Sequence, residues 1–216
     1  MHRTSPSAGA ESAARPQAPQ RKLYFVRHGE TDWNAERRLQ GRLDIPLNDV
    51  GRRQSAQCGS TLRGLIAARH KAPADFTFIS SPLSRARETM EILRGALELP
   101  REGYAIDSRL AELSFGRWEG LTYKDVRALD RSILAVRERD KWNFTPPDGE
   151  SYAQLLVRVR DWQAGLTTDA IVAAHGGVAR VLMVLFGVRA PEDATQGDVV
   201  QGVVYEFAPG LMKRHG

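Results

Sequence analysis

Two histidines and two arginines stand where predicted strands end, and their types indicate phosphoryl chemistry. Arg27 and His28 directly follow one short apolar run, Arg85 lies just after a second, and His175 follows a third and precedes two glycines. A guanidinium group pairs with phosphate oxygens through two parallel hydrogen bonds, whereas it repels a metal cation. A phosphoryl group is therefore the ligand that this combination fits, and no metal site is expected.

Phosphoryl transfer through an enzyme-bound intermediate also needs a nucleophile and an acid. Imidazole is unprotonated near neutral pH and can attack phosphorus, whereas lysine would first have to lose its proton. The candidate acid is Glu112, which stands between apolar residues that would favour its protonated form. Glu119 lies close by in the sequence and is the alternative acid.

Short apolar runs alternate with helical patterns along the chain. Strands are predicted over residues 23–26, 76–79, 171–174 and 202–207. Helices are predicted over residues 49–68, 86–97, 152–166 and 178–186, and the first of them is capped by Asn48 or Asp49.

This alternation predicts an α/β fold, a three-layer sandwich with a mostly parallel central sheet and helices on both faces. The carboxyl ends of parallel strands meet at one edge of such a sheet, and ligands bind there. The histidines and arginines are therefore expected to converge. The helix expected to begin at the two glycines after His175 would present its backbone N–H groups and the positive end of its dipole to an anion.

Composition is that of a globular protein with one domain. The chain has 216 residues, 42% hydrophobic and 26% charged. Residues 1–21 are rich in Ser, Ala, Pro, Gln and Arg and are expected to be a disordered tail. Residues 22–212 are expected to form the single domain.

The net charge of +5 does not indicate nucleic-acid binding. Residues 1–22 and 213–214 carry this excess, and residues 23–212 are formally neutral, whereas a nucleic-acid binder concentrates basic charge on a folded face. Cys58 is the single cysteine, and no apolar run is long enough to span a membrane. The expectation is a cytoplasmic protein with no membrane partner. The oligomeric state stays open, with a homodimer as one option.

A long motif surrounds His28, and shorter motifs follow it in a defined order. They are residues 27–34 (RHGETDWN), 40–41 (QG), 44–48 (DIPLN), 80–86 (SSPLSRA), Glu112 with 115–116 (FG) and 118–120 (WEG), 149–151 (GES) and 175–177 (HGG). Together they resemble the histidine phosphatase superfamily, which includes the cofactor-dependent phosphoglycerate mutases. The resemblance spans residues 22–187.

The resemblance implies a role for each matching residue. His28 would be the phosphorylated nucleophile and Glu112 the proton donor and acceptor, with Arg27, Arg85 and His175 binding the phosphoryl group. The phosphate pocket would further be lined by Thr31, Asn34, Gln40, Gly41 and Gly176. The family needs no metal, and no cofactor is implied.

The predicted activity is hydrolysis of small phosphomonoesters, with a small phosphorylated metabolite as the partner. In mutases of this family the acid is followed by Arg and then by Tyr-Gly, but here these positions hold Leu113 and Phe115. Groups that would bind the carboxylate of phosphoglycerate are thus partly missing, and mutase activity is the alternative. A non-catalytic scaffold is a third hypothesis, but it predicts loss of a pocket residue and none is lost.

Overall fold

The computed structural model describes residues 21–216. Most of the tail predicted to be disordered therefore lies outside the described residues. The strands of the described part are β1 (Leu23–Arg27), β2 (Thr77–Ser80), β3 (Ala105–Ile106), β4 (Ala170–Ala174), β5 (Val204–Ala208) and β6 (Leu211–His215). They form one sheet in the order β3-β2-β4-β1-β5-β6, in which β3, β2, β4 and β1 are parallel and the last two strands are antiparallel.

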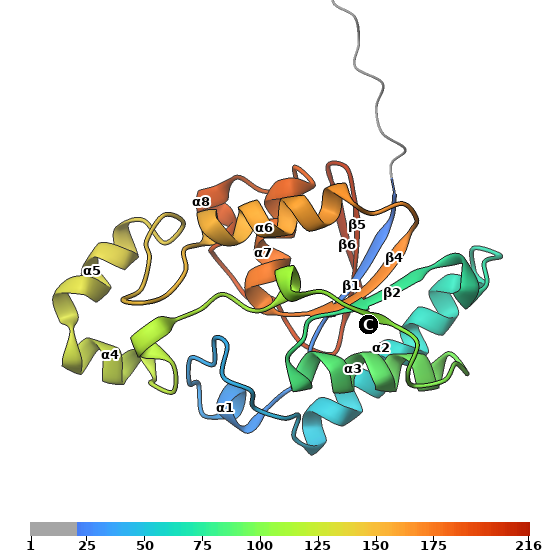
Figure 1. Cartoon of the computed structure of the whole chain (residues 1–216), viewed down its shortest axis with the longest axis horizontal. Coiled ribbons are helices and arrows are strands. Elements are labelled where there is room, and N and C mark those ends of the chain that lie inside the picture. Colours follow the sequence, from blue (N-terminus) through green and yellow to red (C-terminus); the bar gives the residue numbers. More distant parts are fainter. Residues whose placement is uncertain (1–20) are drawn as a thin grey trace, which may run out of the picture.

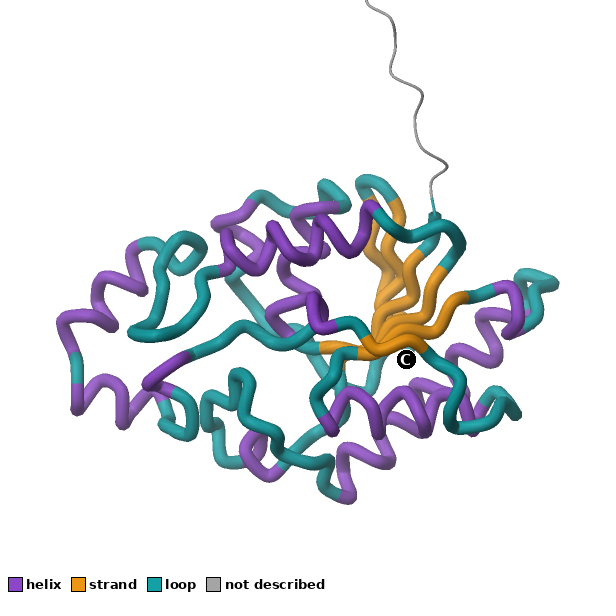
Figure 2. The backbone as a smooth tube through the Cα atoms, in the orientation of Figure 1, coloured by secondary structure: helices purple, strands orange, loops and turns teal. Residues whose placement is uncertain are grey.

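Helices cover both faces of this sheet, as predicted (Figures 1 and 2). The helices are α1 (Asp32–Ala35), α2 (Asp49–Ala67), α3 (Ser84–Ala96), α4 (Tyr123–Leu129), α5 (Arg131–Arg139), α6 (Tyr152–Ala164), α7 (Gly176–Leu185) and α8 (Pro191–Ala194). Short 3₁₀ turns are η1 (Pro73–Asp75), η2 (Ser108–Leu110) and η3 (Gly116–Trp118).

Side chains of β1 alternate between two hydrophobic cores because successive strand residues point to opposite faces. Leu23 and Phe25 pack into the core beneath α6 and α7. Tyr24 and Val26 pack into the core beneath α2 and α3. All residues of β4 are buried, as expected of a central parallel strand. The two cores hold the strand ends in fixed positions.

Several elements were not predicted from the sequence, among them β3, α4, α5 and β6. Both residues of β3 are exposed, α4 and α5 each bury a single residue, and β6 is mostly exposed. Lys213 and Arg214, which were assigned to a C-terminal tail, lie in β6, and the sheet continues to His215 beyond the boundary predicted at residue 212. Part of the net positive charge therefore lies on the sheet and not in a tail.

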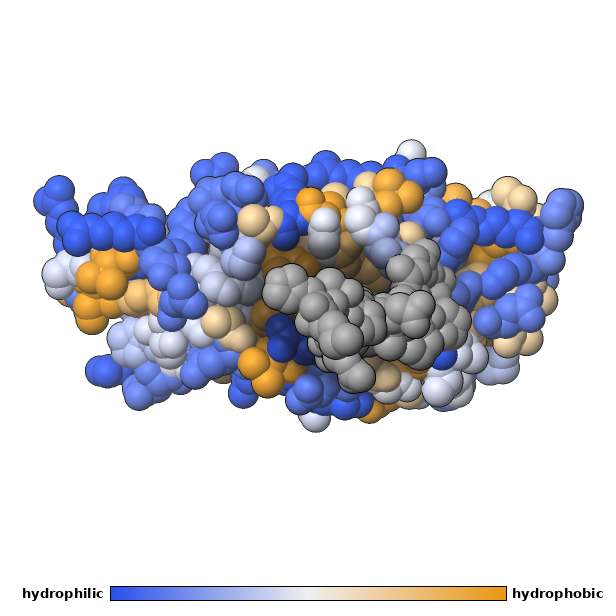
Figure 3. All heavy atoms as spheres, turned by 90° about the horizontal axis from the view of Figure 1, so that it is seen from above, coloured by the Kyte–Doolittle hydropathy of each residue, from blue (hydrophilic) through white to orange (hydrophobic). Residues whose placement is uncertain are grey.

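The helices α4 and α5 form an extension at one end of the molecule (Figure 1). Figure 3 shows apolar surface at this end, where Leu129 and Val136 are exposed. In residues 21–216, no helix is long and apolar enough to cross a membrane.

Candidate active site

The strand register brings the predicted residues to one edge of the sheet. Arg27 pairs with Ala174 in the parallel β1–β4 ladder, so the residues that follow them, His28 and His175, leave the sheet at the same level. The N–H of His28 donates to the carbonyl of Ala174 at 2.9 Å, and that of Ser81 donates to Ala173 at 3.0 Å. Segments far apart in the sequence therefore meet where parallel topology predicts a ligand site.

A cavity of about 280 Å³ lies at this edge. Of the residues predicted for the site, the cavity is lined by Arg27, His28, Asn34, Gln40, Gly41, Arg85, Glu112 and Gly176. His175 and Thr31 lie behind this lining, and both are fully buried. The structure thus brings the predicted residues together, while their roles remain predictions.

The imidazole of His28 is oriented by its own backbone. Its Nδ1 lies 2.7 Å from the carbonyl oxygen of Gly29. A carbonyl can only accept a hydrogen bond, so Nδ1 carries the proton and Nε2 keeps its lone pair. In this tautomer Nε2 is the nitrogen that can attack phosphorus. The N–H of Gly29 in turn donates to Thr89 Oγ1 at 3.2 Å, which fixes the turn.

The imidazole ring of His175 lies beside that of His28. Their ring centroids are 5.1 Å apart, and His175 Nε2 lies 2.6 Å from the hydroxyl oxygen of Ser81. Its Nδ1 is buried and has no hydrogen-bond partner among the described residues. A buried polar atom without a partner is rare and is consistent with a ligand that completes the site.

Both imidazoles are held in the neutral state. Burial, followed by the positive charges of Arg85 and Arg27, lowers the pKa of His28 well below 6.5. Burial is also the main cause that lowers the pKa of His175 well below 6.5, with Arg85 the next cause. Desolvation and neighbouring cations both disfavour the protonated ring. A neutral ring at physiological pH is what a nucleophilic imidazole requires.

The same shifts predict that acid destabilises the fold. Below pH 6.5 the unfolded chain binds protons on His28 and His175 while the folded protein does not, so the free energy of unfolding should fall as pH falls. The slope should approach about 1.4 kcal/mol per pH unit for each histidine. Urea unfolding at pH 7.0 and 5.5 measures it. His175→Asn should show a shallower pH dependence, and an unchanged slope would contradict this assignment.

Arg85 is a buried cation and Arg27 a partly buried one, and within residues 21–216 neither guanidinium group pairs with a carboxylate. Arg85 donates from Nη1 to the carbonyl of Leu43 at 2.7 Å and from Nη2 to that of Gly41 at 2.8 Å. Arg27 donates from Nη1 to the carbonyl of Val199 at 2.6 Å. The Nε atoms of both arginines are buried and have no partner within residues 21–216. Burial lowers the pKa of both guanidinium groups, and the negative charge of Glu112 opposes that shift.

Such an arrangement favours an anionic ligand. A buried charge is costly unless it is paired and hydrogen-bonded. A phosphoryl group could accept hydrogen bonds from both unpartnered Nε atoms and offset the charge. Arg87, two residues further along α3, is exposed. The structure therefore gives Arg85 the buried position.

The N-terminus of α7 anchors Glu112. The N–H of Gly177 donates to its carboxylate oxygens at 3.1 and 3.2 Å, and the N–H of Leu113 donates to Oε1 at 2.8 Å. A Cβ atom on Gly177 would lie 2.4 Å from Glu112 Oε1, so only glycine allows this approach. The carboxyl group therefore faces backbone donors rather than the apolar neighbours expected from the sequence.

Glu119, the alternative acid, has a different position. Its Oε1 accepts hydrogen bonds from the N–H groups of Arg42 and Phe115 and from the hydroxyl of Ser114, at 3.0 to 3.2 Å. Glu119 is not among the side chains of residues 21–216 that line the cavity. A Cβ atom on Gly41, whose φ is +52°, would lie 2.0 Å from that oxygen. Glu119 thus holds the loops of the cavity wall, and of these two carboxylates it is Glu112 that lines the cavity.

Thr31 positions Asn34. Its hydroxyl and its N–H both donate to Asn34 Oδ1, at 3.1 and 3.2 Å, and it caps α1. Gln201 Nε2 also donates to Asn34 Oδ1 and to the carbonyl of His28, both at 3.1 Å. The amide nitrogen of Asn34 is then the group left to donate to a ligand. Gln40 presents a buried Oε1 that has no partner among residues 21–216.

Several residues of the cavity were missed by sequence reasoning. They are Arg38, Leu39, Phe115, Tyr123, Tyr152, Arg180, Asp198 and Val199. Arg180 offered a signal, because it is a single charged residue in the otherwise apolar helix that follows His175. Tyr123 comes from α4, which was not predicted. Burial raises the pKa of Tyr152 to about 12, so this side chain stays a neutral phenol.

The fold and this site define an α/β enzyme of the histidine phosphatase type. The model of the histidine phosphatase superfamily (branch 1) matches residues 23–207, and the chain belongs to this superfamily. The resemblance seen in the motifs is therefore confirmed.

Relatives with named activities include phosphatases and mutases. A glucosyl-3-phosphoglycerate phosphatase of Mycolicibacterium vanbaalenii is 33% identical over 175 residues, which cover 75% of this chain and 72% of the relative. A 2,3-bisphosphoglycerate-dependent phosphoglycerate mutase of Gloeobacter violaceus is 27% identical over 194 residues, covering 86% and 84%. The solved structure of a mycobacterial glucosyl-3-phosphoglycerate phosphatase has a TM-score of 0.73 at 25% identity, covering 87% of this chain and 89% of that one. Of some other mycobacterial relatives the chain spans only 40%.

Proposed function

We propose that this enzyme hydrolyses small phosphomonoesters through a phosphohistidine formed on His28. The observation that carries the proposal is the 2.7 Å contact between His28 Nδ1 and the carbonyl oxygen of Gly29, from which we infer that Nδ1 carries the proton and Nε2 is the neutral nucleophile. The guanidinium groups of Arg27 and Arg85 lie at the same cavity, and each has a buried Nε without a partner among residues 21–216. Positioning and charge stabilisation are the main contributions that a protein makes to phosphoryl transfer.

The first step transfers the phosphoryl group to the enzyme. His28 Nε2 attacks phosphorus as the bond from phosphorus to the ester oxygen breaks. Glu112 gives its proton to that leaving oxygen, so the product departs as a neutral alcohol. Arg27, Arg85 and the start of α7 stabilise the negative charge on the phosphoryl oxygens.

The second step returns the enzyme to its starting state. Water attacks the phosphohistidine, and the carboxylate of Glu112 accepts a proton from it. Inorganic phosphate forms, and His28 leaves as neutral imidazole. The proton that Glu112 accepts in the second step is the one that it donates in the next first step.

The substrate is proposed to be a small phosphorylated metabolite, since a cavity of about 280 Å³ has room for a phosphate and a modest leaving group. Sugar phosphates, nucleotide phosphates of the cobalamin pathway and phosphoglycolate-like compounds are the classes to test. A panel of these phosphomonoesters, with release of inorganic phosphate as the readout, tests the proposal. Failure to release phosphate from every ester would contradict it.

Mutase activity is the alternative proposal, as some relatives are named phosphoglycerate mutases. The position after the acid holds Leu113, which packs in the hydrophobic core, and Phe115 lines the cavity with an apolar ring. Neither side chain can bind a carboxylate. Assaying phosphoglycerate with and without a bisphosphoglycerate distinguishes the two activities. Isomerisation faster than phosphate release would favour the mutase.

Turnover should not depend on a divalent metal. Arg27 and Arg85 occupy the position in which a metal would otherwise neutralise phosphoryl charge. Across residues 21–216, no group of three or more His, Cys, Asp or Glu side chains is arranged to hold a metal ion. Dialysis against a chelator should leave kcat/KM unchanged. A large loss that magnesium or zinc restores would overturn this expectation.

A further inference from the structure

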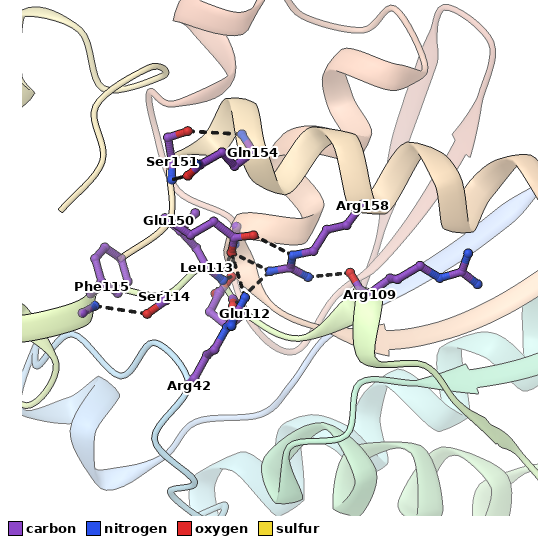
Figure 4. Close-up of polar contacts among 12 residues, drawn as sticks. Arg42, Arg109, Glu112, Leu113, Ser114, Phe115, Glu150, Ser151, Gln154 and Arg158 are labelled. Carbon is purple, nitrogen blue, oxygen red and sulfur yellow. Dashed lines mark hydrogen bonds and ion pairs between the residues drawn. The ribbon is translucent and has the colours of Figure 1, made fainter. Parts of the chain in front are cut away.

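The backbone that carries Glu112 belongs to neither a helix nor a strand. It follows η2 and precedes η3, so regular hydrogen bonds do not hold it. Two arginine side chains hold this backbone segment instead (Figure 4). The carbonyl oxygen of Glu112 accepts from Arg158 Nη2 at 3.2 Å and from Arg42 Nε at 3.5 Å. The position of the carboxyl group therefore depends on these distant side chains.

Arg158 makes the more extensive set of contacts. Its Nη1 donates to the carbonyl of Arg109 at 2.5 Å, so one guanidinium group bonds to the backbone at both ends of the segment 109–112. Its Nε and Nη2 donate to the two carboxylate oxygens of Glu150, both at 2.8 Å. The side chains of Arg158 and Glu150 are 18% and 13% exposed. A bidentate pair that is mostly buried has one geometry, unlike a surface ion pair.

Glu150 extends the connection to the phosphate side of the cavity. Its N–H donates to the carbonyl of Ser114 at 2.9 Å, and its carboxylate accepts from Arg42 Nη2 at 3.3 Å. Arg42 follows Gly41, whose carbonyl accepts from Arg85. The carboxylate of Glu150 thus connects the segment that carries Glu112 to the loop of Gly41 and Arg42, and this loop holds Arg85.

We propose that Arg158, held by Glu150, is a positioning residue that keeps Glu112 aligned for proton transfer. Neither side chain lines the cavity in the described part of the chain, so both act through Glu112. The carboxyl group is fixed at α7 by Gly177 and through its backbone by Arg158, which leaves it little freedom to move. The inference rests on the proposed function, in which Glu112 protonates the leaving oxygen.

The test compares two esters in Arg158→Met, which keeps the length of the side chain but removes the guanidinium group. Because misplacing a catalytic group by about 1 Å can cost about 100-fold, kcat/KM for an alkyl phosphate should fall about 10- to 100-fold. A nitrophenyl phosphate leaves without a proton and should lose less than about threefold. Arg160→Met is the matched control, because Arg160 is exposed on the same helix, and it should leave both rates unchanged.

A double-mutant cycle separates positioning from stability. In the Glu112→Gln background, Arg158→Met should cause no further loss with the alkyl ester, since the proton donor is already absent. Glu150→Gln releases Arg158 from its carboxylate and should show the same dependence on the leaving group. This second variant carries the comparison if Arg158→Met does not fold.

Equal losses for the two esters in the Arg158 or Glu150 variants would overturn the positioning role. So would a loss that persists in full in the Glu112→Gln background. If Glu112→Gln itself affects both esters equally, the acid role fails as well. If only Glu112→Gln distinguishes the esters, the proposed function stands and this inference alone is wrong.

Discussion

His28→Ala is expected to reduce phosphatase turnover by about 10⁴- to 10⁶-fold, the scale of losses when a nucleophile is removed. The methyl group of alanine cannot attack phosphorus, and His175 cannot take over the role of His28, because it is fully buried and does not line the cavity of residues 21–216. The rate with the best ester of the panel measures the effect. Acid-labile label on the protein after mixing with radiolabelled substrate should disappear in the same variant.

The fold of His28→Ala should remain intact, because His28 belongs to neither of the two hydrophobic cores. Thermal unfolding checks this. His70→Ala is the matched control, since His70 is exposed at the end of α2, and it should turn over normally. Near-normal turnover of His28→Ala would mean that the phosphohistidine mechanism is wrong.

In Glu112→Gln, the loss in kcat/KM should be larger for an ester with a poorer leaving group. General acid catalysis contributes about a hundredfold to ten-thousandfold. An alkyl phosphate should therefore lose about 3 to 5 kcal/mol of transition-state stabilisation. The amide oxygen of glutamine can still accept from the N–H of Gly177, so the segment should keep its place. A nitrophenyl phosphate should lose much less, because its leaving oxygen needs no proton.

The measurement is kcat/KM for both esters in the wild type and in Glu112→Gln. The phosphohistidine should still form with the activated ester, because His28, Arg27 and Arg85 are unchanged. Equal losses would show that Glu112 only positions the substrate. Glu119 would then be tested as the acid, although its carboxylate is engaged within its own loop.

Much of the site could be predicted because local chemistry and topology act together. Arg27, His28 and His175 directly follow apolar runs, and such runs form buried parallel strands whose ends meet at one edge. Arg85 follows from the same reasoning through β2. The helices α2, α3, α6 and α7 were predicted because each buries a continuous apolar face.

Other elements gave weak signals. The helices α4 and α5 have few buried residues, and β6 is stabilised by pairing with β5 rather than by burial of its own side chains. Tyr123 therefore entered the cavity unpredicted. Sequence spacing also cannot show which polar atoms are left without partners, since that depends on packing.

The sequence by itself determined the α/β class and predicted the candidate nucleophile His28 with Arg27 and Arg85 beside it, because these depend on residue type beside a strand end. Only the tertiary structure showed that Glu112 and not Glu119 lines the cavity in residues 21–216. The two carboxylates are seven positions apart, yet one meets the N-terminus of α7 while the other bonds to Arg42 and Phe115. The tertiary structure also decided the hydrogen-bond partners of Gln201 and Arg158, which lie far away in the sequence. A hydrogen bond forms only when donor and acceptor lie within a narrow range of distances and angles. For partners that are distant in the sequence, the folded chain decides whether that geometry is met.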